Sequence, residues 1–153
     1  MATILDYRSS QNSNTNFETP GTAIGATPVF IGDIGLIVGN ATNIRVNLWA
    51  TVGLDRDTTS GGASEVTFYI ARNLNPTNVF VPANVIFTAV QEVEPEGPNN
   101  DDQLIVTLNA ADLNPTPGPI PGQINYSLFA QRTAGPDVTR NGPENLTGMA
   151  IID

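Results

Sequence analysis

The chain contains no cysteine, histidine or lysine among its 153 residues. Without cysteine it has no disulfide, thiol nucleophile or thiolate metal site, and without histidine it lacks the commonest general base and the commonest metal ligand. Without lysine, Schiff-base chemistry is excluded too, and six arginines are the only side-chain cations. We therefore expect no catalytic residues, no metal site and no cofactor.

Charged residues are also scarce, at 14% of the chain. A pair of carboxylates is the one familiar catalytic arrangement that these absences leave open, as in glycoside hydrolysis. Almost every acid falls in an expected loop or at a strand end, and aromatic residues make up only 7% of the chain. The sequence therefore predicts a protein that is not an enzyme.

The formal net charge is −9, and the arginines are scattered without forming a run. Nucleic acids and anionic membranes require a clustered basic surface, so neither is an expected partner. No segment reaches the ~18–20 apolar residues that a membrane-spanning helix needs. The first eight residues lack the basic start and apolar stretch of a signal peptide. A surface of neutral polar residues suits contact with other surfaces, because few charges must be desolvated.

Short apolar runs separated by turn clusters predict an all-β fold. In the clearest run, every second residue is apolar, which places Ile44, Val46, Leu48, Ala50 and Val52 on one inward face of a strand. Six further strands are predicted. They cover residues 29–38, 65–72, 85–93, 103–109, 123–132 and 146–152.

The segments between these strands contain strong breakers, such as the four prolines within residues 114–122. A short helical turn is expected only at Leu108–Leu113. Seven or eight antiparallel strands joined by long crossing loops favour a jelly-roll sandwich over a simple meander. We assign residues 28–153 to this single domain.

Residues 1–27 differ from the rest, since they are rich in Ser, Asn, Thr and Gly. Their isolated apolar residues are Ile4, Leu5, Tyr7 and Phe17. This composition predicts an extended N-terminal arm. Such an arm either pairs with a sheet edge of a neighbouring copy or remains a free tail, and the sequence does not decide between the two.

Trp49 falls on the outward face of its strand, and Tyr69 holds the equivalent position on the next clear strand. An exposed aromatic stripe formed by the two would stack on sugar rings or form the core of a subunit interface. Alternatively, a second layer such as the arm covers Trp49. All three interpretations remain open at this point.

Acidic residues gather at Asp55–Asp57 and along residues 92–102. Calcium takes six to eight oxygen ligands, often from loops. The spacing matches no calcium-loop signature, and Pro95 and Pro98 interrupt it. We expect solvated acidic loops at both places.

Three strand segments carry a resemblance to a known group of proteins: Leu48–Val52, Val66–Ile70 and Asn125–Ala130, together with the ending Gly148–Ile151. In pattern and composition they resemble the jelly-roll proteins of bacterial spore surfaces. That group includes exosporium proteins and endospore-appendage pilins, and it is similar to the tumour-necrosis-factor and C1q fold. The resemblance implies a self-assembling structural subunit deposited outside the cell or on the spore surface.

We therefore expect a subunit of an extracellular filament or a spore-surface layer, with the chain itself as its main partner and residues 1–27 bridging to a neighbour. The contact residues would be Ile4, Leu5, Tyr7, Phe17, Trp49 and Tyr69. One alternative is a jelly roll that binds a glycan or another ligand through Trp49 and Tyr69. Another is a capsid or tail protein of a phage.

Overall fold

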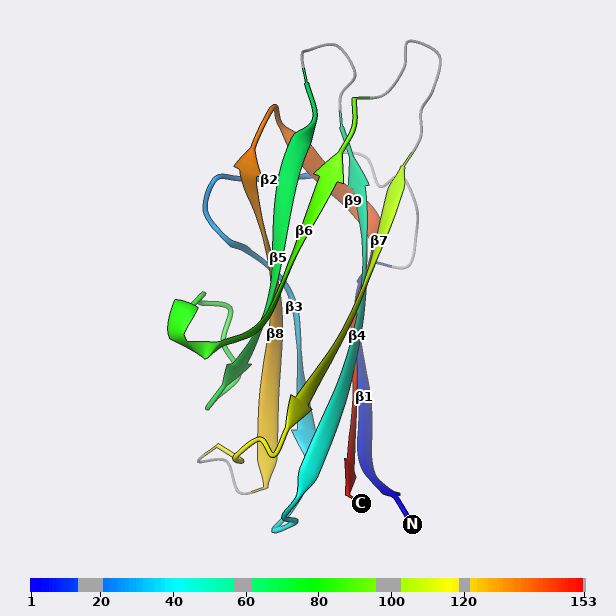
Figure 1. Cartoon of the computed structure of the whole chain (residues 1–153), viewed down its shortest axis with the longest axis vertical. Coiled ribbons are helices and arrows are strands. Elements are labelled where there is room, and N and C mark those ends of the chain that lie inside the picture. The colour runs from blue at the N-terminus through cyan, green and yellow to red at the C-terminus, as the bar shows by residue number, and fades with distance from the viewer. Residues whose placement is uncertain (14–20, 57–61, 96–102, 119–121, 153) are drawn as a thin grey trace.

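The computed structural model describes residues 1–13, 21–56, 62–95, 103–118 and 122–152. These parts of the chain form nine strands in two packed sheets (Figure 1). The strands are β1 (Thr3–Ser13), β2 (Thr22–Ile24), β3 (Val29–Ile37), β4 (Ile44–Asp55), β5 (Ser64–Asn73), β6 (Val85–Val93), β7 (Leu104–Leu113), β8 (Gln123–Ala134) and β9 (Val138–Ile152). One short 3₁₀ helix, η1 (Pro82–Asn84), precedes β6, and within the described ranges no helix has the length and apolar character to cross a membrane.

One sheet has the strand order β1-β9-β4-β7, with the short β2 also paired to β9, and we call it the β4 sheet. The other has the order β3-β8-β5-β6, and we call it the β8 sheet. Every pairing is antiparallel. The chain crosses between sheets at most of its connections, so sequential strands rarely pair, and the strand order is that of a jelly roll. The predicted all-β jelly roll is confirmed.

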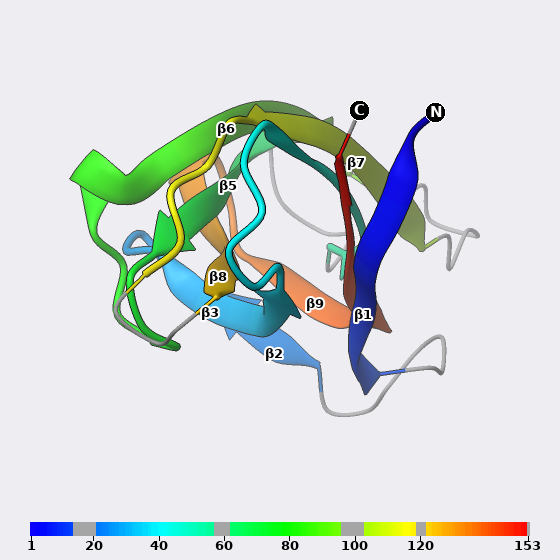
Figure 2. The same cartoon turned by 90° about the horizontal axis from the view of Figure 1, so that it is seen from below.

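The core lies between the sheets (Figure 2). The inward-facing residues predicted on β4, from Ile44 to Val52, are all buried, and so are Val66, Phe68 and Ile70 on β5. Alternation places apolar side chains on one face of each strand, and facing the two sheets together removes those side chains from water. Each predicted strand is present, but β9 begins at Val138, eight residues before the predicted start, and β7 continues to Leu113, four residues beyond the predicted end.

The predicted helical turn at Leu108–Leu113 is wrong, because β7 continues as a strand to Leu113. Ala110 pairs with Leu48 of β4, and Ala111 pairs with Asn47. Alanine favours a helix locally, but the hydrogen-bonding edge of β4 lies beside this segment and the strand continues along it.

The nine strands exceed the seven or eight expected, because two come from residues before 28. Residues 3–13 of the expected arm form β1, which pairs along β9 from Thr3 to Ser13. Asp6 also links β1 to the other sheet, since its Oδ2 accepts a hydrogen bond of 2.8 Å from the Ile37 N–H. Because β1 and β2 consist mostly of polar residues, a search for alternating apolar residues does not find them. In this single chain the arm therefore pairs with its own domain.

Candidate interaction surfaces

The outer face of the β4 sheet is built from the outward-pointing residues of four strands. In register, three neighbouring rows cross it from β1 through β9 and β4 to β7. We call these positions the β4 face. They are Tyr7, Met149, Asn47 and Ala111 in one row, Ser9, Thr147, Trp49 and Asn109 in the next, and Gln11, Asn145, Thr51 and Thr107 in the third. None carries a charged side chain, and most end in a hydroxyl or an amide.

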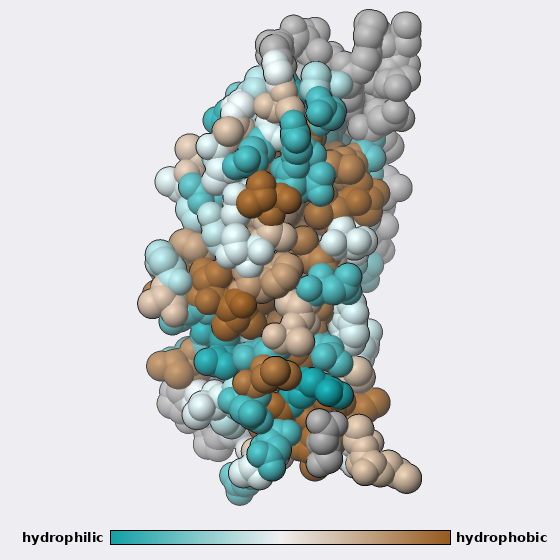
Figure 3. Space-filling model, in the orientation of Figure 1, coloured by the Kyte–Doolittle hydropathy of each residue, from teal (hydrophilic) through white to brown (hydrophobic). Residues whose placement is uncertain are grey.

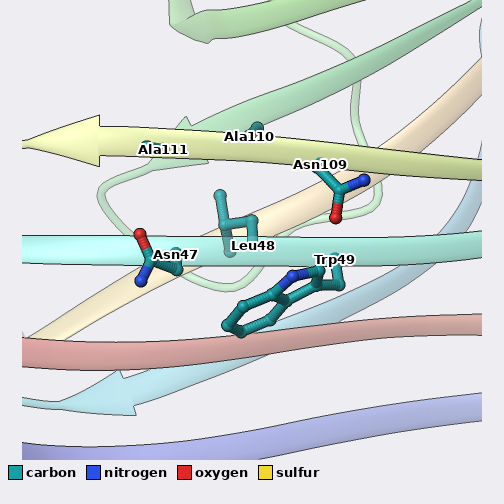
Figure 4. A pocket seen from close by; sticks show the side chains of 6 residues that line it. All are labelled: Asn47, Leu48, Trp49, Asn109, Ala110 and Ala111. Atoms are coloured by element: carbon teal, nitrogen blue, oxygen red, sulfur yellow. The ribbon is translucent and has the colours of Figure 1, made fainter.

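Trp49 has the largest side chain of the middle row and is 38% exposed. A hollow of about 340 Å³ lies beside it, lined by Asn47, Leu48, Trp49, Asn109, Ala110 and Ala111. Figure 4 shows the indole extending alongside β4 and Asn109 standing on β7. The hollow exists because Ala111 is short while its neighbours Trp49 and Asn109 are long. At this place on the β4 face an aromatic ring and amide side chains line one concave surface.

The outer face of the β8 sheet is organised differently, because the segment between β5 and β6 lies over it. Phe80 of that segment packs against Tyr69 at 5.0 Å between ring centroids and against Phe129 at 5.3 Å. Phe30 closes the other side of Phe129 at 5.8 Å. Three hydrogen bonds join the segment to the sheet. The Ser127 hydroxyl donates to the Thr77 carbonyl at 2.9 Å, the Asn84 amide donates to Asn73 at 3.0 Å, and the Asn125 amide donates to the Leu74 carbonyl at 3.4 Å.

Tyr69 therefore does not lie beside Trp49. The β4–β5 connection crosses from one sheet to the other, so the two rings face opposite sides of the sandwich and form no common stripe. The Tyr69 hydroxyl donates to Gln131 Oε1 at 2.9 Å, and its ring is covered by Phe80. Equivalent positions on successive strands share one surface only when the strands share a sheet, which a single sequence does not reveal.

The predicted contact residues of the arm also lie in different environments. Ile4 and Tyr7 are 62% and 60% exposed on β1, on the side that continues the β4 face. Leu5 is partly buried and packs against the core. Phe17 lies outside the described residues.

Asn47 lies on the same face as Trp49, as the alternation of apolar and polar residues along β4 predicts from the sequence. Asn109 and Ala111 were not identified, because their position opposite Trp49 and Asn47 depends on the β4–β7 register. That register is set by long-range pairing and leaves no local signal in the sequence.

A partly buried polar network connects the two sheets near the β7 edge. Arg72 Nη1 of β5 donates to both carboxylate oxygens of Asp112 on β7, at 3.0 and 2.9 Å. The Tyr126 hydroxyl of β8 donates to Asp112 Oδ2 at 2.9 Å. Burial, the neighbouring Asp112 charge and this hydrogen bond raise the pKa of Tyr126 above its ordinary value. Because the donors and acceptors satisfy one another inside the sandwich, we interpret the network as a structural link between the sheets.

No group of three or more His, Cys, Asp or Glu residues able to hold a metal gathers among the described residues. Asp57 and residues 96–102 of the expected acidic loops lie outside the described ranges.

These sheets and their strand order define the chain as a jelly-roll protein. No protein-family model and no curated protein matches it. Among solved structures it is similar to the Eiger TNF of S. frugiperda, with a TM-score of 0.40 and 12% identity over 78% of this chain. It is also similar to an arabinose-bound MgGH51 α-L-arabinofuranosidase, with a TM-score of 0.34 and 9% identity over 99% of the chain.

A third similar structure is that of the T=1 particles of infectious bursal virus, with a TM-score of 0.31 and 10% identity over 96% of this chain. The matches span 64%, 23% and 35% of those three structures respectively, which is less than two thirds of each. At these identities the likeness concerns the fold alone.

Proposed function

We propose that the chain is a structural subunit, without catalytic activity, that assembles with copies of itself into an extracellular filament or a spore-surface layer. In this proposal β1 leaves its own sheet and pairs with β9 of a neighbouring copy. The observation that carries the proposal is how β1 is held: it forms a long ladder with β9 but contributes almost no buried apolar side chain.

The burial pattern of β1 supports an exchange that costs little free energy. Ser13 is the only residue of the strand that is fully buried, and Leu5 is its only apolar residue packed partly against the core. The other contacts that hold β1 include backbone hydrogen bonds to β9, the Ser9–Thr147 side-chain hydrogen bond and the Asp6–Ile37 bond to β3. A neighbouring copy offers the same β9 edge and the same Ile37 N–H, so exchange replaces every contact with an identical one. An exposed sheet edge is a known acceptor for such a strand.

The composition of the surface supports the same proposal. The β4 face carries no charge at the positions defined above, and Ile4 and Tyr7 add exposed apolar area beside it. Beside β1, this neutral surface with the exposed Ile4 and Tyr7 allows a neighbouring copy to pack without the cost of desolvating ions. The net charge of −9 keeps single copies soluble before they assemble.

A cysteine pair tests the exchange, because the chain has no cysteine of its own. The Ser9 and Thr147 side chains touch across β1 and β9, with 3.0 Å between their hydroxyl oxygens. In the double variant S9C/T147C, oxidation after assembly should join successive copies into a ladder of covalent multimers on a non-reducing denaturing gel. The geometry suits a disulfide, since directly opposed residues of antiparallel strands lie within its Cα range of roughly 4.4–6.8 Å.

The matched control is T51C/N145C, which opposes two residues of the interior strands β4 and β9 and should cross-link only within one chain. Negative-stain electron microscopy of the same samples reports whether filaments or layers form. Assemblies whose Ser9–Thr147 links are all within single chains would overturn strand exchange and leave assembly through another surface. Dispersed single particles at all concentrations would overturn the self-assembly proposal as a whole.

A further inference from the structure

The hollow beside Trp49 has features that strand exchange does not use. Its lining combines the indole of Trp49 with the side-chain amides of Asn47 and Asn109, and Ala111 on β7 adds only a small side chain (Figure 4). We propose that this hollow binds a neutral carbohydrate chain, with Trp49 stacking on a sugar ring and the two asparagines bonding its hydroxyls. The proposal does not depend on how β1 is paired.

The chemistry of the lining favours a sugar over other ligands. A pyranose ring offers an apolar face of C–H groups and a rim of hydroxyls that each donate and accept hydrogen bonds. The indole offers a flat, electron-rich face for the C–H groups. Each asparagine amide has both a carbonyl acceptor and two N–H donors for the rim. An aromatic wall with a few polar groups that fix orientation is the usual composition of a ligand site.

The lining of the hollow favours a neutral ligand. All six of its residues are uncharged, and the nearest cation on this face of β4 is Arg45, one row beyond Asn47, so the hollow suits a neutral ligand better than a phosphate, a nucleotide or a charged peptide. The hydroxyls and amides of Ser9, Thr147, Asn145, Thr51 and Thr107 surround Trp49 in register. Such a surface is too polar for a lipid tail but continues the hydrogen-bonding pattern that further sugar units would meet.

The position of the hollow indicates how a chain would lie. Its far wall stands on β7, the edge strand of the β4 sheet, so an oligosaccharide can extend beyond the sheet without meeting another strand. Figure 3 shows that the side of the molecule carrying β6 and β7 mixes hydrophobic and hydrophilic patches. The volume of about 340 Å³ is at the lower end of the range for small-molecule pockets, roughly 300–1,000 Å³. An open platform of this size predicts modest affinity, with a Kd on the order of 0.1–1 mM.

Trp49 is the only tryptophan of the chain, so intrinsic fluorescence reports this site alone. The test is titration of the whole chain with cellohexaose, chitohexaose, xylohexaose and mannohexaose, each repeated by calorimetry. At least one should produce a saturable change in Trp49 emission. By calorimetry, W49A should weaken that binding by about tenfold or more, as expected for loss of an aromatic stacking partner. The variants N47A and N109A should each weaken it by about fivefold, as expected for loss of one hydrogen bond.

Two further variants separate the site from the fold. A111Q fills the hollow from an exposed position and should weaken binding as strongly as W49A without unfolding the chain. V90A removes a side chain that is 59% exposed on the other sheet and should leave binding unchanged. Failure of all four sugars to bind, or unchanged binding by a folded W49A, would overturn the proposal. A Trp49 emission that changes with protein concentration alone would overturn it as well, because a second copy would then cover the face.

Discussion

Phe129 and Trp49 hold equivalent positions on opposite sides of the sandwich, since each points outward from an interior strand of its sheet. Phe129 is nevertheless 0% exposed, whereas Trp49 is 38% exposed. The difference comes from the segment between β5 and β6, which places Phe80 over the β8 sheet. Nothing among the described residues covers the β4 face in the same way. One outward aromatic residue thus belongs to the core and the other to a surface available for contact.

The largest expected effect comes from replacing the covered aromatic residue. Phe129→Ala removes a ring that contacts Phe30 on one side and Phe80 on the other. Loss of a fully buried phenylalanine costs about 3–5 kcal/mol of unfolding free energy. Urea unfolding followed by circular dichroism measures the change. A loss below that of Trp49→Ala would mean that the cover over the β8 sheet does not form a second core.

The cover itself is tested by Phe80→Ala. The variant keeps Phe129 but exposes it together with Tyr69, so unfolding should require about 1–2 kcal/mol less free energy, and a hydrophobic dye should bind the folded protein more strongly. Val79→Ala is the matched control, because Val79 is 61% exposed in the same segment. The control should change stability by less than about 0.5 kcal/mol. Equal effects of the two variants would contradict the covering role of Phe80.

The sequence carried enough information for the strands and their inward faces, because apolar residues alternate on β4, β5 and β8 and the inward set is buried on each. The sequence did not reveal that residues 74–84 cover Phe129, because these residues show no periodic apolar pattern and their position over Phe129 depends on the fold. The strand β1 was missed for a related reason: its inward positions Asp6, Arg8 and Ser10 are polar and carry no apolar signal. The pairing of Trp49 with Asn109 likewise depends on β-register between distant segments.

The hydrogen-bond network of Arg72, Asp112 and Tyr126, which links the two sheets, makes the stability of the fold sensitive to alkali. Burial and the adjacent Asp112 raise the pKa of Tyr126 above its ordinary value of 10.0. The unfolded chain therefore loses this proton at a lower pH than the folded chain does, and ionisation favours unfolding. Stability is intact below pH 10 and should fall above it by up to about 1.4 kcal/mol per pH unit.

Urea unfolding at pH 9, 10 and 11 measures this dependence. Tyr126→Phe is the control, because it has no proton to lose and should show a smaller decrease between pH 10 and 11. A parallel decrease in both proteins would assign the alkaline sensitivity to other groups.

On the β4 face, Trp49→Ala should lower the free energy of unfolding by at most about 1 kcal/mol, because the side chain lies on the sheet surface and its loss removes only local packing. Comparison with Phe129→Ala under the same urea conditions measures the contrast between the faces directly. A cost of 3 kcal/mol or more, of the size expected for a buried aromatic residue, would show that Trp49 is covered in solution, for example by a second copy.

The smallest effect on stability is expected from Asp6, whose carboxylate bonds β1, the strand proposed to exchange, to β3. Partial burial alone raises the pKa of this carboxyl, but hydrogen bonds from the Ile37 N–H, the Arg8 side chain and the Tyr7 N–H outweigh it and hold the pKa below 3.8. The contribution of Asp6 is therefore present above pH 3.8 and is lost as the pH falls through the lowered value. The protection of the β1 amides against hydrogen exchange, relative to the intrinsic exchange rate at each pH, should fall on acidification before that of β4, and Asp6→Asn should remove part of this pH dependence. If β1 release precedes assembly, incubation of S9C/T147C at the acid pH before oxidation at neutral pH should increase the share of cross-links that join different copies. An unchanged share would separate the hold of Asp6 from strand exchange.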